Sequence, residues 1–195
     1  MTIDELKKYV SIKEIKGDCV RIKANDGYML KLGESYTDES YCEKSTIPDN
    51  IAVIPYSTYL IESNKEKYKG MTVEEAKEML IAEIAAYDTS DKVNGFMLNG
   101  LLVWLDKATR VGLMNSTTIS KAAGQKATTL WLGGAKLVVD CDKAIQLLSA
   151  LEMYALECFN VTASHKAAVG ELKSIEEVEA YDYKAGYPKM LEMSV

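Results

Sequence analysis

One long segment constrains the fold of this chain more than any other. From Asp140 or Asp142 to about Val169, apolar side chains recur at the spacing of a single α-helix, and Gly170 is expected to close it. The apolar face is wide, so we expect the helix to be buried on more than one side, in its own core or against a second copy. This face comprises Ala144, Leu147, Leu148, Leu151, Tyr154, Ala155, Cys158 and Val161, extended by Ile145, Ala150 and Phe159.

Two β-hairpins are predicted before this helix. Asn99-Gly100 lies at the centre of residues 96–104, and Gly133-Gly134 lies at the centre of residues 128–139. Tight hairpin turns need positive φ at successive residues, which Asn and Gly tolerate. Between the hairpins, Asp106 is expected to cap a helix that ends at Gly124.

Three segments have the spacing of a capping box, in which a hydroxyl and an acid three residues later bond to free helix N–H groups. They are residues 2–5, 72–75 and 174–177. The second opens an amphipathic helix predicted over 72–87. The third opens the last helical stretch, which Gly186-Tyr187-Pro188 is expected to end.

The beginning of the chain is richer in strand patterns. Residues 19–23 and 28–32 predict two strands, and residues 51–54 predict another. The polar residues 34–50 are interpreted as a long exposed loop. The polar, Lys-rich residues 62–70 are interpreted as a linker.

These patterns together predict an α+β fold with two domains. Residues 1–70 form a small β-rich module suited to docking or attachment, and residues 71–195 form a helical domain with two β-hairpins packed on a long helix. The net charge of −6 argues against nucleic-acid or membrane-surface partners. We recognise no secretory signal and no apolar run of the ~20 residues needed to span a bilayer.

The sequence offers no catalytic or metal-binding pattern. The four cysteines, which lie outside any C-x-x-C pair, are expected to be reduced thiols: Cys19, Cys42, Cys141 and Cys158. His165 is the only histidine, and two helical turns, about 11 Å of rise, separate it from Cys158. We therefore expect a structural histidine at a helix end, and no catalytic residue, metal ligand or cofactor.

Large aromatic side chains are the candidate interface residues. Tyrosine combines an apolar ring with a polar tip and suits interfaces, although ordinary packing of the β-rich module explains a tyrosine cluster equally well. The two tryptophans lie on the two hairpins, where they could anchor either the core or an interface. The candidates are Tyr36, Tyr41, Tyr56, Tyr59, Trp104, Trp131 and Tyr154.

Several short segments in the second half carry a resemblance to a known family. They are Tyr87-Asp88-Thr89-Ser90, Val93-Asn94-Gly95-Phe96, Val103-Trp104-Leu105-Asp106, Arg110, Thr129-Leu130-Trp131, Tyr154-Ala155, Cys158-Phe159, Thr162, His165, Glu177-Val178-Glu179-Ala180-Tyr181-Asp182-Tyr183 and Gly186-Tyr187-Pro188. Over about residues 86–191 the chain resembles a phage-associated domain family of unknown molecular function. Its members include tail- and fibre-associated proteins of bacteriophages, notably those infecting gut Bacteroides-type bacteria. The resemblance implies a structural role in a virion and supplies no catalytic residues.

The expected function is accordingly that of a non-enzymatic virion protein. It would be a tail, fibre or head-decoration component, made in the host cytoplasm, that acts through protein–protein interfaces with other virion proteins. Because virion parts repeat by symmetry, we expect a homo-oligomer. An assembly factor that is not retained in the particle is the alternative, and an enzyme is a third, for which no convergent polar residues are evident. Nothing in the sequence supports a host-surface glycan or protein as a ligand.

Overall fold

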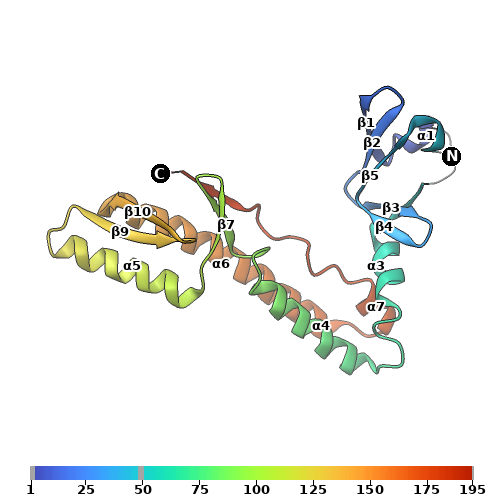
Figure 1. Cartoon of the computed structure of the whole chain (residues 1–195). Helices are drawn as coiled ribbons and strands as arrows, with labels where there is room; N and C mark the ends of the chain where they lie inside the picture. The colour runs from blue at the N-terminus through green and yellow to red at the C-terminus, as the bar shows by residue number, and fades with distance from the viewer. Residues whose placement is uncertain (1–2, 48–50, 195) are drawn as a thin grey trace. The chain divides into compact units, whose positions relative to one another are not determined.

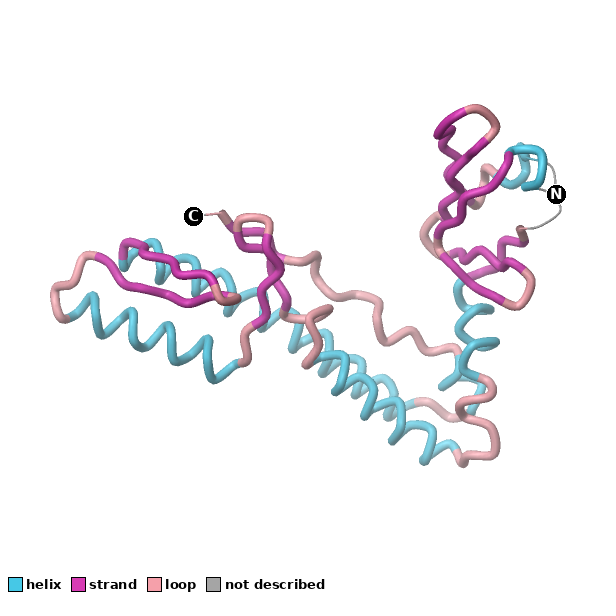
Figure 2. The backbone as a smooth tube through the Cα atoms, in the orientation of Figure 1, coloured by secondary structure: helices cyan, strands magenta, loops and turns pink. Residues whose placement is uncertain are grey.

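The computed structural model describes residues 3–47 and 51–194, and it divides the chain into two compact units (Figures 1 and 2). The first unit comprises the chain up to Ala76 together with Lys173–Asp182. The second comprises Lys77–Leu172 together with the chain from Tyr183. Small antiparallel sheets in the first unit, and hairpins packed on a long helix in the second, confirm the predicted α+β fold class.

The first unit contains two three-stranded antiparallel sheets, with strand orders β1-β2-β5 and β4-β3-β6. Val20 and Ile22 alternate along the central strand β2, and both are fully buried. They form a core with Leu30 of the second sheet. The elements of this unit are α1 (Ile3–Leu6), β1 (Val10–Lys16), β2 (Cys19–Ala24), β3 (Tyr28–Leu32), β4 (Ser35–Thr37), β5 (Glu39–Glu43), η1 (Lys44–Thr46), β6 (Ala52–Pro55), α3 (Tyr56–Asn64) and α7 (Ile175–Glu179).

The prediction of a long loop over residues 34–50 is wrong. Residues 35–37 and 39–43 form β4 and β5, and η1 follows. Strand pairing joins backbone groups, so polar side chains do not prevent it. In β5, Cys42 lies opposite Val20 and packs against the core, while polar neighbours alternate outward. Residues 48–50 of the predicted loop lie outside the described part of the chain.

The prediction of a linker over residues 62–70 is also wrong. Helix α3 continues to Asn64, whose Nδ2 donates a hydrogen bond to the Glu179 carbonyl oxygen at 2.9 Å. Tyr68, a few residues later, is fully buried. Residues 173–182 therefore belong to the first unit although they follow the long helix. The division into domains 1–70 and 71–195 stays a prediction about independent folding.

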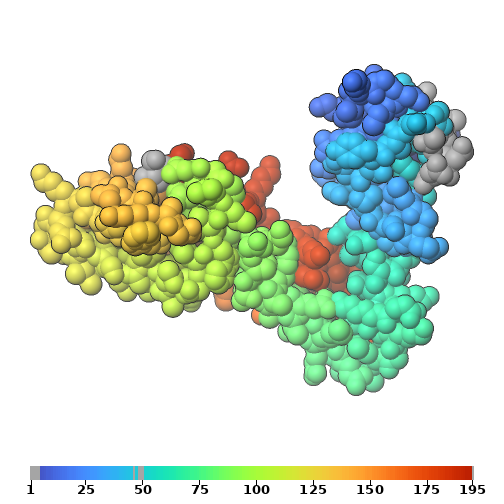
Figure 3. Space-filling view, viewed as in Figure 1, coloured from blue at the N-terminus to red at the C-terminus, as the bar shows by residue number. Residues whose placement is uncertain are grey.

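The second unit places its strands beside three helices. Its elements are α4 (Val73–Asp88, from Lys77 onward), β7 (Gly95–Leu98), β8 (Leu101–Trp104), α5 (Lys107–Ala122), β9 (Ala127–Leu132), β10 (Ala135–Asp140), α6 (Cys141–Glu171) and β11 (Leu191–Met193). Strand β11 pairs in parallel with β7 to complete the sheet β11-β7-β8. The β9–β10 hairpin forms a separate two-stranded sheet and lies at the surface (orange in Figure 3).

Both predicted hairpins and the helix between them are confirmed. Asn99 and Gly100 have φ values of 49° and 82°, as a two-residue turn of the primed type requires. The Asp106 carboxylate accepts a hydrogen bond from the Thr109 N–H at 2.8 Å and caps α5. Gly124, just beyond the end of α5, has a φ of 81°.

Helix α6, 31 residues long, supports the rest of the second unit. Asp140 caps it by accepting a hydrogen bond from the Asp142 N–H at 2.9 Å. Helix α5 lies along its first half (Figure 1). Helix α4 lies beside its second half, where Lys77 and Asp88 form hydrogen bonds with α6. Lys77 of α4 donates to the carbonyl oxygens of Gly170 and Leu172, at 2.7 and 3.1 Å. The lysine thereby satisfies carbonyls that the end of a helix leaves free.

The core of the second unit joins this helix to both hairpins. Its buried members include Phe96, Leu98, Val103, Leu130, Leu132, Val139, Leu148, Leu151 and Cys158. Within the described residues, none of the helices has the length and apolar content needed to cross a membrane.

The three capping boxes have different outcomes. Thr72 and Glu75 form the expected reciprocal pair, in which the Thr72 N–H donates to the Glu75 carboxylate at 2.8 Å and holds its pKa below the ordinary value. Ser174 caps α7, but this helix ends at Glu179, so the prediction of a helical stretch reaching Gly186 is wrong. Thr2, which begins the first box, lies outside the described residues.

The expectation that Gly170 closes the long helix is wrong as well. Helix α6 continues through Gly170 to Glu171, and Leu172 leaves it with an extended backbone. Gly170 is not among the glycines with positive φ, so it ends no helix here.

Gly95→Ala tests the packing at the start of β7, and Gly112→Ala in α5 is its control. A Cβ at position 95 would lie 2.2 Å from the Asp91 carbonyl oxygen, so Gly95→Ala should destabilise the protein by about 1–3 kcal/mol. A Cβ at Gly112, in the exposed part of α5, would meet no atom within 4 Å outside the backbone of its own helix, so Gly112→Ala should stabilise the protein by about 0.5–1 kcal/mol. Urea unfolding of both variants measures this difference, and equal effects of the two substitutions would contradict it.

Candidate functional site

A polar network connects the end of α4 to α6 and to the segment near the C-terminus. The Thr162 hydroxyl donates a hydrogen bond to the Asp88 carboxylate at 2.7 Å and lies 2.8 Å from the Tyr187 hydroxyl. Thr162 is buried within α6, so its hydroxyl needs these partners. Burial raises the pKa of the Tyr187 hydroxyl, which keeps the phenol protonated as a donor.

Aromatic rings surround this network. The Tyr87 ring lies edge-on to Tyr183 and Tyr187, with centroids 5.6 and 5.5 Å away. His165 Nε2 lies 2.9 Å from the Ala185 carbonyl oxygen, and its ring lies 5.8 Å from that of Tyr187. Together these contacts hold residues 183–187 against α4 and α6.

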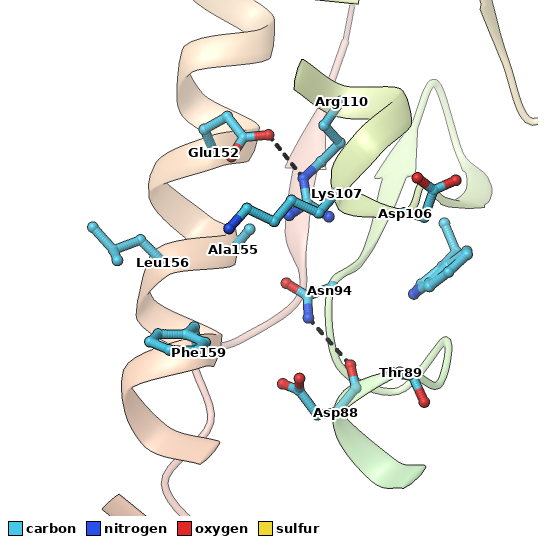
Figure 4. A pocket seen from close by; sticks show the side chains of 11 residues that line it. Asp88, Thr89, Asn94, Asp106, Lys107, Arg110, Glu152, Ala155, Leu156 and Phe159 are labelled. Atoms are coloured by element: carbon cyan, nitrogen blue, oxygen red, sulfur yellow. Dashed lines mark hydrogen bonds and ion pairs between the residues drawn. The ribbon is translucent and has the colours of Figure 1, made fainter. Parts of the chain in front are cut away.

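A pocket of about 400 Å³ opens beside the network, and Asp88 belongs to both (Figure 4). It lies where the end of α4, the β8–α5 junction and one face of α6 converge. The lining residues are Asp88, Thr89, Asn94, Trp104, Asp106, Lys107, Arg110, Glu152, Ala155, Leu156 and Phe159.

The charged residues of the pocket largely serve structural contacts. Arg110, which is buried, donates from Nε to Glu152 at 2.9 Å and from Nη1 to the Leu105 carbonyl oxygen at 2.8 Å. The Asp106 carboxylate accepts hydrogen bonds from the backbone N–H and the hydroxyl of Thr109. The bond from the hydroxyl is the main cause of its lowered pKa. The Asp106 carboxylate is therefore held ionised by its capping contacts, and the Glu152 carboxylate is engaged by Arg110.

Lys107 differs from these groups. Its side chain extends from the first turn of α5 toward α6 (Figure 4). Among the described residues it forms no ion pair with a carboxylate. Its ammonium group is the cation of the pocket that is available to a bound molecule.

Asn94 lines the pocket and has a left-handed conformation with a φ of 63°. Its Nδ2 donates to the Asp88 carbonyl oxygen at 3.2 Å (Figure 4). Its Oδ1 is buried and has no hydrogen-bond partner among the described residues. A buried acceptor without a partner is costly, so Oδ1 is a polar atom of the pocket with unused hydrogen-bonding capacity.

The rim of the pocket is apolar and exposed. Trp104, Leu156 and Phe159 are 41%, 50% and 60% exposed, although all three are large hydrophobic side chains. Exposed apolar side chains that adjoin a pocket are typical of binding surfaces. No group of three or more potential metal ligands occurs within the described ranges. This arrangement is suited to holding an apolar group of a partner.

The structure brings three of the tyrosine candidates together in the first unit. Tyr59 lies 5.2 Å from Tyr36 and 5.4 Å from Tyr56, measured between ring centroids. The Tyr36 hydroxyl bonds to Glu62, which also pairs with Lys31 at 2.8 Å. The Lys31 hydrogen bond is the main cause that lowers the pKa of Glu62.

The other candidates are dispersed. Tyr41 is exposed on β5, in the other sheet, where its hydroxyl donates to Glu39 at 2.8 Å. Trp131 is exposed on the outer face of the β9–β10 hairpin, together with Val138. Tyr154 is only 7% exposed, in the core of the second unit, so little of its ring can reach a partner. Trp104 alone among the candidates lines the pocket.

Sequence reasoning missed most of the pocket. The sequence patterns do not indicate that Asn94, Lys107 and Leu156 line one pocket. The first and last of them are 62 residues apart in the sequence, and only the fold brings them together. One feature of the sequence did point to this surface. Phe159 widens the apolar face of the long helix beyond the part that one core would cover.

Thr162→Val tests the polar network. The substitution preserves shape but removes the hydroxyl that bridges Asp88 and Tyr187, so the free energy of unfolding should fall by about 1–3 kcal/mol. Thr118→Val is the matched control, because the exposed Thr118 hydroxyl bonds only within α5, to Met114, and its loss should change stability by less than about 0.5 kcal/mol. Equal values for both variants in urea unfolding would contradict a bridging role.

Tyr154 should give the protein a pH-dependent stability. Burial raises the pKa of its hydroxyl to about 12, above the ~10 of an unfolded tyrosine. Since the folded state holds the proton more tightly, this contribution is complete below pH ~10 and is lost as the pH rises toward 12. The free energy of unfolding should therefore fall less steeply over this range in Tyr154→Phe than in the wild type. Parallel slopes would refute this.

Comparison with known proteins places the chain in a family. No curated protein matches it, and neither does any solved structure. A family model described as a domain of unknown function, DUF4376, matches residues 75–185, which include the pocket and the Asp88–Thr162 contact. The match covers more than half of the chain, and the chain therefore belongs to the DUF4376 family.

Proposed function

We propose that this protein is a non-enzymatic structural component of a bacteriophage particle, acting as a tail, fibre or head-decoration protein. The phage association rests on the resemblance of residues 86–191 to domains of tail- and fibre-associated proteins. In this proposal the protein works in the virion, without a cofactor, through contacts with other virion proteins.

The observation that carries the binding role is the exposed apolar rim of the pocket. Trp104, Leu156 and Phe159 remain exposed beside a pocket that the Arg110–Glu152 ion pair also lines. Leaving such side chains in water costs free energy that a partner would recover by covering them. Tryptophan is also frequent among residues that dominate binding energy.

The pocket chemistry supports a protein partner. An apolar side chain fits the rim, a carboxylate or carbonyl oxygen can pair with Lys107, and a backbone N–H can donate to Asn94 if its acceptor becomes accessible. The carboxylates beside them are engaged in capping and pairing, which supports binding rather than acid–base catalysis. The Tyr36–Tyr56–Tyr59 cluster of the first unit is a second candidate surface.

Mass spectrometry of purified phage particles, with copy-number measurement, tests the location. We expect many copies per particle. Absence from particles despite expression during infection would contradict a virion role and favour the alternative, an assembly factor that leaves before the particle is complete.

Trp104→Ala tests the pocket as the contact surface. The variant should remain folded, because the side chain is partly exposed, but its incorporation into particles should fall about tenfold or more. Leu101→Ala is the matched control, since Leu101 is exposed on the same strand outside the pocket, and it should be incorporated normally. Normal incorporation of folded Trp104→Ala would exclude the pocket as this contact.

A further inference from the structure

Two Asn-Gly dipeptides occur in the chain, Asn94-Gly95 and Asn99-Gly100. In such a pair the backbone nitrogen of the glycine can attack the side-chain carbonyl carbon of the asparagine, since glycine has no Cβ to hinder the approach. The asparagine then loses ammonia and a five-membered succinimide forms. Both dipeptides have this chemistry available, and the structure distinguishes them by how tightly each is held.

The fold holds Asn94 tightly. Its Nδ2 donates a hydrogen bond to the Asp88 carbonyl oxygen at 3.2 Å, and its Oδ1 is buried. Gly95 is buried as well, and a Cβ there would lie 2.2 Å from the Asp91 carbonyl oxygen. To react, the Asn94 side chain would have to leave its hydrogen bond and swing over a closely packed backbone, so we expect folding to slow the reaction at this site.

Asn99 and Gly100 form the exposed tip of the β7–β8 hairpin. A Cβ at position 100 would meet no atom within 4 Å outside its chain neighbours, so the space around this backbone is open. Within the described residues no acceptor receives the Gly100 N–H, so the nitrogen that would attack is not held by a hydrogen bond. The tip of a two-residue hairpin also opens locally more easily than a segment packed in the core.

We propose that Asn99 is a modification site at which the folded protein deamidates spontaneously. The Gly100 nitrogen gives its proton to hydroxide and forms a bond to Cγ of Asn99. The bond from Cγ to Nδ2 breaks, and the nitrogen takes a proton from water and leaves as ammonia. Water then adds to one of the two carbonyl groups of the succinimide and opens the ring, which yields aspartate or isoaspartate. Water is the only co-reactant, and nothing is oxidised or reduced.

The reaction changes the turn and its neighbour. Isoaspartate adds one carbon to the backbone of a turn that has only two residues, with φ values of 49° and 82°. The Asn99 N–H donates to the Met193 carbonyl oxygen of β11 at 2.9 Å, so a distorted turn also weakens the attachment of β11. This inference goes beyond the proposed function, because the reaction needs no partner and proceeds inside or outside a phage particle.

Peptide mapping by mass spectrometry tests the proposal on the full chain, incubated folded in mildly alkaline buffer. Deamidation replaces an amide by a carboxylic acid and raises the mass by about 1 Da, and the acid is ionised at this pH. Fragmentation of the peptide that contains both asparagines locates the change. Asn99 should react about tenfold or more faster than Asn94, because local opening reaches the hairpin tip first. An unchanged Asn99, or an Asn94 that reacts as fast, would overturn the proposal.

The same chain unfolded in guanidinium chloride is the control. Without the fold, both asparagines precede a glycine in a flexible chain, so their rates should agree within about threefold. Folding should then slow Asn94 strongly and Asn99 little. If folding slows Asn99 as much as Asn94, the turn protects its own asparagine and the proposal is wrong. Circular dichroism establishes that the incubated protein is folded in the first experiment and unfolded in the second.

Discussion

Burial of one face of α6 is the interaction on which the second unit depends. Leu148, Leu151 and Cys158 are almost fully buried and form one core with both hairpins. An isolated two-stranded hairpin is at best marginally stable in water, so both hairpins need this apolar surface. The same face holds one polar exception, Thr162, whose hydroxyl is satisfied by Asp88 and thereby ties the end of α4 to the core.

That contact also explains where the pocket lies. Asp88 ends α4, and the chain then turns through Asn94 into β7, leaving a space between this turn and α6. Arg110 and Glu152 keep α5 and α6 together on the other side of the space. Helix ends and paired charges thus surround a surface whose apolar side chains stay in water. The carboxylates of the pocket are engaged in capping and pairing, whereas its large apolar side chains remain in water, and this contrast favours a binding role.

The first unit has a different physical basis. Its strands are short and largely polar, and its core is confined to a few aliphatic side chains such as Val20, Ile22 and Leu30. Backbone pairing with β2 makes β5 a strand although its sequence is Glu-Ser-Tyr-Cys-Glu. Sequence patterns identify strands through side-chain alternation, and β5 has one inward apolar residue, so it resembled a loop. Membership of residues 173–182 in this unit had no sequence signal, because the contact of Asn64 with Glu179 spans 115 residues.

The sequence by itself determined the features that depend on a few neighbouring residues. The turn at Asn99-Gly100 and the caps at Asp106 and Asp140 follow from backbone φ and local hydrogen bonds, and the long helix follows from its periodic apolar residues. Only the tertiary structure decided which apolar side chains become buried. The sequence pattern placed Tyr154 and Phe159 on one wide apolar face of this helix, yet the core covers the first and leaves the second exposed at the pocket. Periodicity gives the direction of a side chain about its helix, whereas the neighbours that cover it come from distant parts of the chain.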